Sequence, residues 1–222
     1  MKKETIKSGF TIISVFAATI LLTGCSTPMT PKEVTQYFDT PSSVHFNEAI
    51  YVHVSDKRPE EERKGTTWLE RYIVTIDGEN PERTALFFAD DLAKILIYKK
   101  ITEHAYPLKP TEKPPLNATV IKIQLLSWYG RVPDPKKLSK TEQFLTSGLG
   151  SKTVALDNQG HCKFSASMIR QNKTIDLGTF TEKYSTYLNR PGTVTDANNL
   201  SAAAADRAFV QFLKTFDKKM NH

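Results

Sequence analysis

The sequence predicts an α+β domain, a mostly antiparallel sheet of five or six strands with two helices packed on one of its faces. Three observations support this prediction. Several short segments alternate apolar and polar residues, as half-buried strands do. Two longer segments repeat apolar residues every three or four positions, and turn residues separate the short segments of the C-terminal half. A chain of 222 residues is long enough for one such domain, which we place at residues 45–222.

The N-terminal half of this domain opens with a strand at residues 49–54, where every second residue is apolar. The charge-dense stretch at 55–65 cannot be buried and predicts a long loop, and residues 68–76 form a weaker strand. Asn80-Pro81-Glu82 then starts a helix, because Asn caps a free amide, Pro fits the first turn and Glu suits the positive end of the helix dipole. An apolar stripe carries this helix to about Lys100.

The middle of the domain contains the best strand of the chain, at residues 118–129, after a shorter one at 101–106. In the long strand, apolar residues occupy one face while Lys122 and Gln124 occupy the other, so the strand has a core face and a solvated face. The segment 133–150 that follows is irregular, with a short helix near 141–146.

The C-terminal part predicts a meander and a last helix. The meander strands lie at 153–156, 162–169 and 175–184. In the last of these strands the apolar residues change from odd to even positions at Gly178. We therefore predict a β-bulge there that turns Phe180 back to the core face. The helix starts near Thr195 or Asp196 and runs to about Lys219. Its apolar stripe consists of Ala202, Ala205, Phe209, Phe212, Leu213 and Phe216, and its alanine run, 202–205, predicts a close approach to the sheet.

Residues 1–24 have the parts of a secretory signal peptide: lysines, an apolar stretch at 10–22, and small residues. The apolar stretch is too short for a membrane span, which takes about 20 apolar residues. Leu22-Thr23-Gly24-Cys25 resembles the lipobox of bacterial lipoproteins. The resemblance implies cleavage before Cys25, acylation of this cysteine and lasting attachment to the bilayer. An ordinary secretory signal with a chance cysteine is the alternative.

The residues after Cys25 predict where the protein is held. Ser26 resembles an outer-membrane sorting signal, so we expect the periplasmic side of the outer membrane, with the inner membrane as the alternative. Residues 25–44 carry Ser, Thr and three prolines, which disfavour packed structure. We therefore expect a flexible tether that lets the domain stand off the membrane.

Charge and cysteine content exclude some classes of partner and bond. The formal net charge is +6, and the basic residues are scattered among almost as many acids. This pattern differs from the clustered basic face of a nucleic-acid reader, so we expect no nucleic-acid partner. If Cys25 carries lipid, Cys162 has no partner for an intramolecular disulfide. We interpret Cys162 as a buried strand residue, the alternative being a reactive or intermolecular thiol.

The sequence contains no pattern typical of an active site, and we expect neither an enzyme nor a cofactor. None of the five histidines has a partner four residues away, and the neighbours His161 and Cys162 point to opposite faces of a strand, so we expect no metal. The stretch 148–153 lacks the residue order of a phosphate loop. We interpret the acidic runs 60–62 and 90–91 as solvated surface.

Several features together resemble a known group of envelope proteins. They are the lipobox, the short tether, the Val-x-Val-Ser-Asp-x-Arg pattern of Val52 to Arg58, the glycines Gly148 and Gly150 before the meander, and the alanine-rich last helix. This combination is similar to the YajG-like and ABC-transport auxiliary lipoproteins, whose domain resembles the N-terminal domain of TolB. The resemblance implies a non-enzymatic adaptor or auxiliary component of an envelope transport or assembly machine.

The predicted fold also indicates where a partner would bind. Two helices cover only one face of the sheet, so the other is available for contact. We place Tyr51, His53, Lys122, Gln124 and Trp128 on this open face as candidate partner-binding residues. The alternative for Trp128 is packing beneath residues 133–150. Two other functions stay open: a carrier of lipid or another small ligand, which needs an apolar pocket, and a cell-wall enzyme, which needs a perturbed acid or nucleophile.

Overall fold

The computed structural model describes residues 29–64, 72–75, 80–133, 158–186 and 193–221. Their strands are β1 (Ile50–Asp56), β2 (Tyr72–Thr75), β3 (Ala105–Leu108), β4 (Thr119–Pro133), β5 (Gln159–Arg170) and β6 (Lys173–Ser185). The described helices are α1 (Pro31–Asp39), α2 (Glu60–Lys64), α3 (Pro81–Tyr98) and α5 (Val194–Met220). None of these helices is long and apolar enough to cross a membrane.

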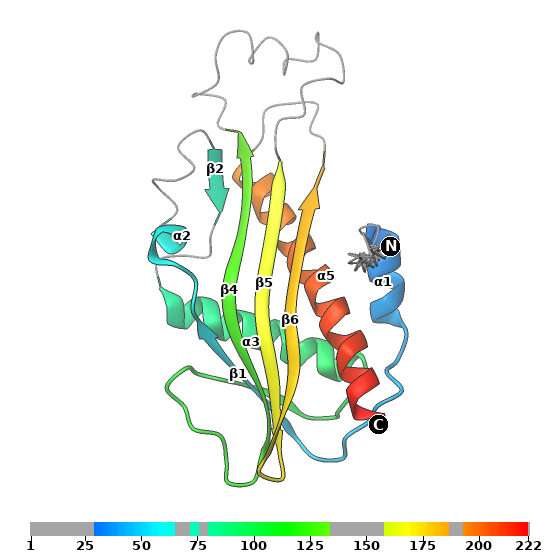
Figure 1. Cartoon of the computed structure of the whole chain (residues 1–222). Helices are drawn as coiled ribbons and strands as arrows, with labels where there is room; N and C mark the ends of the chain where they lie inside the picture. Colours follow the sequence, from blue (N-terminus) through cyan, green and yellow to red (C-terminus); the bar gives the residue numbers. More distant parts are fainter. Residues whose placement is uncertain (1–28, 65–71, 76–79, 134–157, 187–192, 222) are drawn as a thin grey trace, which may run out of the picture.

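The sheet has the order β3-β1-β4-β5-β6, and β2 pairs with the far end of β4 (Figure 1). β1 runs parallel to both β3 and β4, whereas the β2–β4, β4–β5 and β5–β6 pairs are antiparallel. The prediction of a mostly antiparallel sheet is therefore wrong, and the sheet is mixed. The reason is α3, which carries the chain back along the sheet before β3 and β4, so that these two strands run parallel to β1.

Helices α3 and α5 cover the same face of the sheet, as predicted for the two long helices (Figure 1). The core between them is built of aromatic side chains from three elements. The Phe88 ring of α3 lies 4.8 Å from that of Phe209 in α5 and 5.5 Å from that of Phe164 in β5. All three side chains are buried, so this cluster joins both helices to the centre of the sheet.

The segment expected to be a flexible tether contains a helix in its described part. α1 starts at Pro31, and the Thr30 side chain and Glu33 form a capping box at its first turn. Val34 is buried, and α1 packs against α5 and α3. The prediction treated each proline as a breaker, but a proline in the first turn of a helix removes a donor that has no partner there. The tether prediction is therefore wrong from Thr30 to Asp39.

Two β-bulges in the sheet reverse which face the side chains that follow them occupy. In β6 the register shifts opposite Ala166, where Leu177 is the extra residue and Gly178 has φ +106°. Phe180 is buried beyond this shift, which confirms the predicted bulge. A second bulge, which we did not predict, lies in β4 between Leu125 and Ser127.

The N-terminal part of α5 lies almost in contact with the strands below it. A Cβ on Gly130 would sit 1.7 Å from the Ala197 carbonyl oxygen, and one on Gly160 would sit 1.8 Å from that of Leu200. The close approach therefore depends on strand glycines, not on the helix alanines that we expected to allow it. Of the predicted apolar stripe, Ala202 is exposed and the other five residues are buried.

Several predictions lie outside the described residues. They concern the signal peptide and Cys25, most of the irregular segment with its helix at 141–146, the glycines Gly148 and Gly150, and the strand at 153–156.

Candidate functional site on the open sheet face

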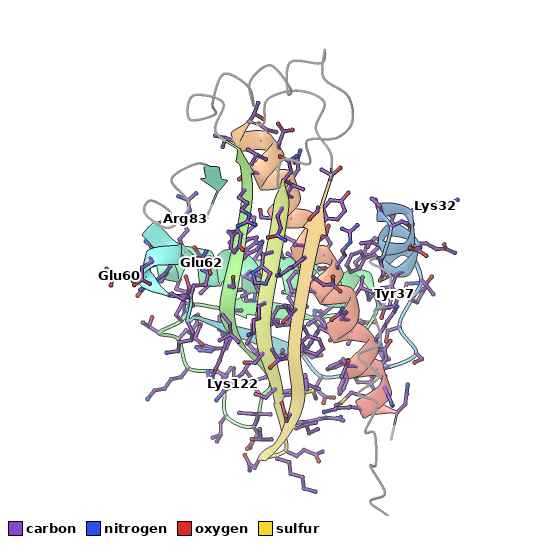
Figure 2. All side chains as sticks on the ribbon, turned by 45° about the horizontal axis from the view of Figure 1, so that its top comes forward. Lys32, Tyr37, Glu60, Glu62, Arg83 and Lys122 are labelled. Atoms are coloured by element: carbon purple, nitrogen blue, oxygen red, sulfur yellow. The ribbon has the colours of Figure 1, made fainter. Side chains whose placement is uncertain are left out.

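The face of the sheet opposite α3 and α5 carries four of the five predicted contact residues. Lys122 and Gln124 are exposed, and Tyr51 and His53 are half-buried. The Tyr51 ring lies 5.6 Å from the ring of Tyr106, its direct neighbour on β3, and His53 Nε2 is 3.0 Å from the carbonyl oxygen of Pro110. The structure therefore brings these residues to one surface, which we call the open face (Lys122 is labelled in Figure 2).

Trp128 lies on the other face, which corrects its predicted position. Its indole Nε1 donates to the Ser201 carbonyl oxygen of α5 at 3.1 Å, and its ring lies 5.5 Å from Phe88. The β4 bulge explains the difference, because the extra residue reverses the alternation of the strand after Leu125. The side chain is 8% exposed, so it belongs to the core. Packing beneath residues 133–150 involves residues outside the described part of the chain.

A buried arginine ties the loop after β1 to β4, and an ion pair with Asp56 holds this arginine in place. Arg58 contacts both carboxylate oxygens of Asp56, at 3.0 and 2.8 Å, and donates to the Trp128 carbonyl oxygen at 3.2 Å. Both side chains are at most 1% exposed. Two-point pairing of this kind satisfies charges that would be costly to bury alone. The end of the Val-x-Val-Ser-Asp-x-Arg pattern thus has a structural role in fixing the path of this loop.

Glu62 of α2 binds the bulge itself. Its Oε1 accepts the backbone N–H of Trp128 at 2.8 Å, and its Oε2 accepts the hydroxyl of Ser127 at 2.9 Å. Burial raises the pKa of Glu62, although these two donors and Arg58 favour the charged form. The prediction that the charged stretch cannot be buried is wrong for Arg58 and Glu62, since each has a partner in β4.

His161 continues this polar cluster on β5. Its Nδ1 lies 2.8 Å from Ser127 Oγ, and its ring lies 5.3 Å from that of Tyr129. Burial, together with Lys183, Lys163 and Arg131, lowers the pKa of His161 to about 4. The imidazole is therefore neutral at pH 7 and surrounded by cations.

These cations extend the open face beyond the residues that we predicted. Lys163 is opposite Thr181 in the register, His161 is opposite Lys183, and Ser165 is opposite Thr179. Lys163, Lys183 and both threonines are exposed, so the open face is rich in ammonium and hydroxyl groups. At its other end, Tyr106 is 46% exposed and stacks at 6.4 Å on His104.

Strand parity could have identified the residues that sequence reasoning missed. Cys162 and Phe164 are core residues, so Lys163 between them must point to the open face. Tyr106 follows in the same way once β3 is known to pair with β1 in register. Cys162 is fully buried, as predicted, and burial raises the pKa of its thiol, which disfavours a reactive thiolate.

The Glu62–Ser127–His161 cluster does not have the arrangement of a hydrolytic triad. In a triad the histidine lies between the serine and the acid, so that it takes the hydroxyl proton while the acid orients it. Here the serine lies between the other two and is 8% exposed. Its hydroxyl joins α2 to β5. Among the described residues no group of three metal-ligating side chains is close enough to hold an ion.

Comparisons with known proteins give no family for this chain. No protein-family model matches the sequence, and no curated protein matches it significantly. Among solved structures, the fold is similar to protein XCC0632 from Xanthomonas campestris, described with the family DUF330, at a TM-score of 0.40 and 10% identity over 82% of this chain and 95% of that one.

Two other solved structures show a similar level of likeness. One is a PelC dodecamer from Paraburkholderia phytofirmans, with a TM-score of 0.38 and 15% identity over 79% of this chain and 92% of that one. The other is an uncharacterized protein, with a TM-score of 0.39 and 6% identity over 81% of this chain and 95% of that one. Likeness at this level carries no argument about function, and the resemblance to YajG-like or transport auxiliary lipoproteins stays a prediction.

Proposed function

We propose that this protein is a lipid-anchored, non-enzymatic adaptor of the bacterial envelope. Acylated Cys25 would hold it on the periplasmic side of the outer membrane, and the open face would bind a protein of an envelope transport or assembly machine. The lipobox-like run before Cys25 supports the anchor. The composition of the open face is the observation that carries the binding role.

Within the described chain, the open face joins two kinds of contact group. Tyr51 and Tyr106 form an aromatic pair at one end, and tyrosine is enriched among the residues that contribute most to interface energy. Lys122, Lys163 and Lys183 supply positive charge along the neighbouring strands. We therefore expect a partner with an acidic surface beside an apolar spot, attracted over distance by the lysines and held by the tyrosines.

A capture experiment in intact cells tests the binding role. Tagged wild-type protein and a Tyr106→Ala, Lys122→Glu variant are crosslinked, purified and compared by mass spectrometry. We expect the variant to recover its main partner at about one tenth of the wild-type yield, equivalent to a loss of about 1.4 kcal/mol. Equal recovery by this variant would contradict the binding role.

The matched control alters an exposed apolar residue and a lysine on the helices. Ile97 is 44% exposed on α3, and Lys218 is exposed on α5. The Ile97→Ala, Lys218→Glu variant should recover the partner in wild-type yield. The anchor is tested separately with Cys25→Ala, which we expect to leave the membrane fraction after a high-salt wash. Retention of that variant on membranes would contradict acylation as the anchor.

A further inference from the structure

The start of α1 is fastened to the domain by a buried arginine. Arg207 of α5 is 2% exposed, and its Nε donates to the Met29 carbonyl oxygen at 2.8 Å. Its Nη1 donates to the Ala203 carbonyl oxygen at 2.9 Å, and the guanidinium lies 3.9 Å from the centre of the Tyr184 ring. These partners hold the arginine in place, so the chain at Met29 is fixed relative to α5 and β6.

The end of α1 is fastened by a second buried cation. Lys99 is 2% exposed, and its Nζ donates to the carbonyl oxygens of Tyr37, at 2.7 Å, and Thr40. The same ammonium lies 4.1 Å from the centre of the Tyr37 ring. Tyr98 adds a hydrogen bond of 2.8 Å from its hydroxyl to Asp39. Because both ends are bound, α1 is part of the domain and moves with it.

This docking shortens the link between the domain and a lipid on Cys25. Only three residues separate Cys25 from Met29 in the sequence. Four residue steps span at most about 14 Å when fully extended. A long tether would leave the domain free to turn in any direction, but a link of this length keeps the first turn of α1 close to the headgroups.

We infer that the flank of the domain carrying α1 and the adjoining side of α5 lies against the bilayer surface. This inference rests on the lipid anchor of the proposed function. Figure 1 shows α1 and α2 beyond opposite lateral edges of the strands, with α2 on the left and α1 on the right. Figure 2 shows Lys32 on the opposite flank from Glu60 and Arg83. The flank that contains α2 and the first turn of α3 therefore faces away from the membrane.

Two lysines beside the anchor suit a headgroup surface, and the acid of the same turn, Glu33, is engaged by Thr30 in the capping box. Lys32 and Lys214 are exposed, and Lys214 Nζ lies 4.0 Å from Met29 Sδ and 5.4 Å from the centre of the Tyr37 ring. Basic side chains next to a lipid anchor are attracted to anionic headgroups. Lys122 on the open face lies away from Lys32 (Figure 2), so the orientation leaves this part of the face free for a partner.

Site-specific quenching of a fluorophore tests this orientation with the full-length acylated protein. The protein is reconstituted into phosphatidylethanolamine and phosphatidylglycerol vesicles that carry a headgroup-attached quencher. A fluorophore with one positive charge, which replaces the charge of the side chain it substitutes, is placed with Lys32→Cys on α1, Lys214→Cys on α5 and Arg83→Cys on α3, all exposed sites. The buried Cys162 gives little background labelling. Lys214→Cys reports on the body of the domain and not on α1 alone.

We expect quenching at positions 32 and 214 to be at least about threefold stronger than at position 83, given a link of about 14 Å. Quenching at position 214 no stronger than at position 83, with the protein still floating with the vesicles, would overturn the orientation and leave the anchor intact. Protein that lacks acyl groups by intact mass, or does not float with vesicles, would overturn the anchor and the orientation with it.

Discussion

The Glu62 carboxylate accepts the backbone N–H of Trp128 at 2.8 Å, at the point where β4 bulges. Arg58 donates to the carbonyl oxygen of the same residue at 3.2 Å. Both polar backbone groups of Trp128 thus find partners in the segment that follows β1, one in the loop and one in α2. Because an unpaired backbone group is costly to bury, the loop and the bulge stabilise each other. This relationship fixes which side chains of β4 reach the core and which reach the open face.

Removal of the Glu62 side chain tests this coupling. Glu62→Ala leaves the Trp128 N–H buried without an acceptor, and we expect a loss of about 1–3 kcal/mol in the free energy of unfolding. Glu62→Gln keeps a carbonyl oxygen for this N–H and should lose less. Urea unfolding measures both. Glu103→Ala, at an exposed site, should change stability by less than about 0.5 kcal/mol. Equal effects of the Glu62→Ala and Glu103→Ala changes would show that the hydrogen bond from Trp128 to Glu62 contributes nothing to the free energy of unfolding.

The close approach of α5 to the sheet predicts a strong effect of a single methyl group. In Gly160→Ala the new Cβ would lie 1.8 Å from the Leu200 carbonyl oxygen, so the helix or the strand must move. We expect a loss of about 1–3 kcal/mol, the usual range for overpacking. Thermal unfolding checks this against Ser165→Ala, which removes a hydroxyl on the same strand but on the open face. A melting temperature equal to that of the wild type would contradict the close contact.

The environment of His161 predicts a pH dependence of stability. Its pKa is lowered from 6.5 to about 4 by burial and by Lys183, Lys163 and Arg131. Between these values the unfolded chain binds a proton that the folded chain does not, so stability falls as the pH falls from 6.5 towards 4. His161→Gln should therefore flatten the decrease in melting temperature between pH 7 and 4.5. The raised pKa of Glu62 acts in the opposite direction, so both variants should be measured.

Titration of the imidazole by nuclear magnetic resonance separates the causes of this shift. Lys183→Gln removes one of the cations that lower the pKa of His161, and it should raise that pKa. Lys122→Gln removes a lysine of the same face that is not among these causes, and it should have a smaller effect. A larger effect of the Lys122 change would mean that the charges around His161 are arranged differently.

Local patterns predicted most elements because they depend on local chemistry. The cap at Asn80 and the stripe of α3 are examples, and the glycine at the parity change of β6 marked its bulge. The position of Trp128 could not be predicted in the same way. The β4 bulge has no glycine to mark it. Its partners, Arg58 and Glu62, come from the charged stretch 55–65, which we expected to be a solvated loop.

Long-range pairing also limited what the sequence could show. Alternation assigns the strands, but the parallel pairing of β1 with β3 and β4 depends on the path of α3. Without that pairing, Tyr106 could not be placed beside Tyr51 on the open face. The docking of α1 was missed for a related reason, since Arg207 and Lys99 bind it from distant parts of the chain.

Photocrosslinking in living cells tests most directly whether the open face is where a partner binds. A benzophenone amino acid is introduced at Gln124, which is exposed on this face, and at Ile97, which is 44% exposed on α3. We predict a discrete crosslinked species from position 124 that is absent from position 97 and that disappears with Tyr106→Ala, Lys122→Glu. No crosslinked protein from position 124, or the same products from both positions, would contradict the proposed adaptor.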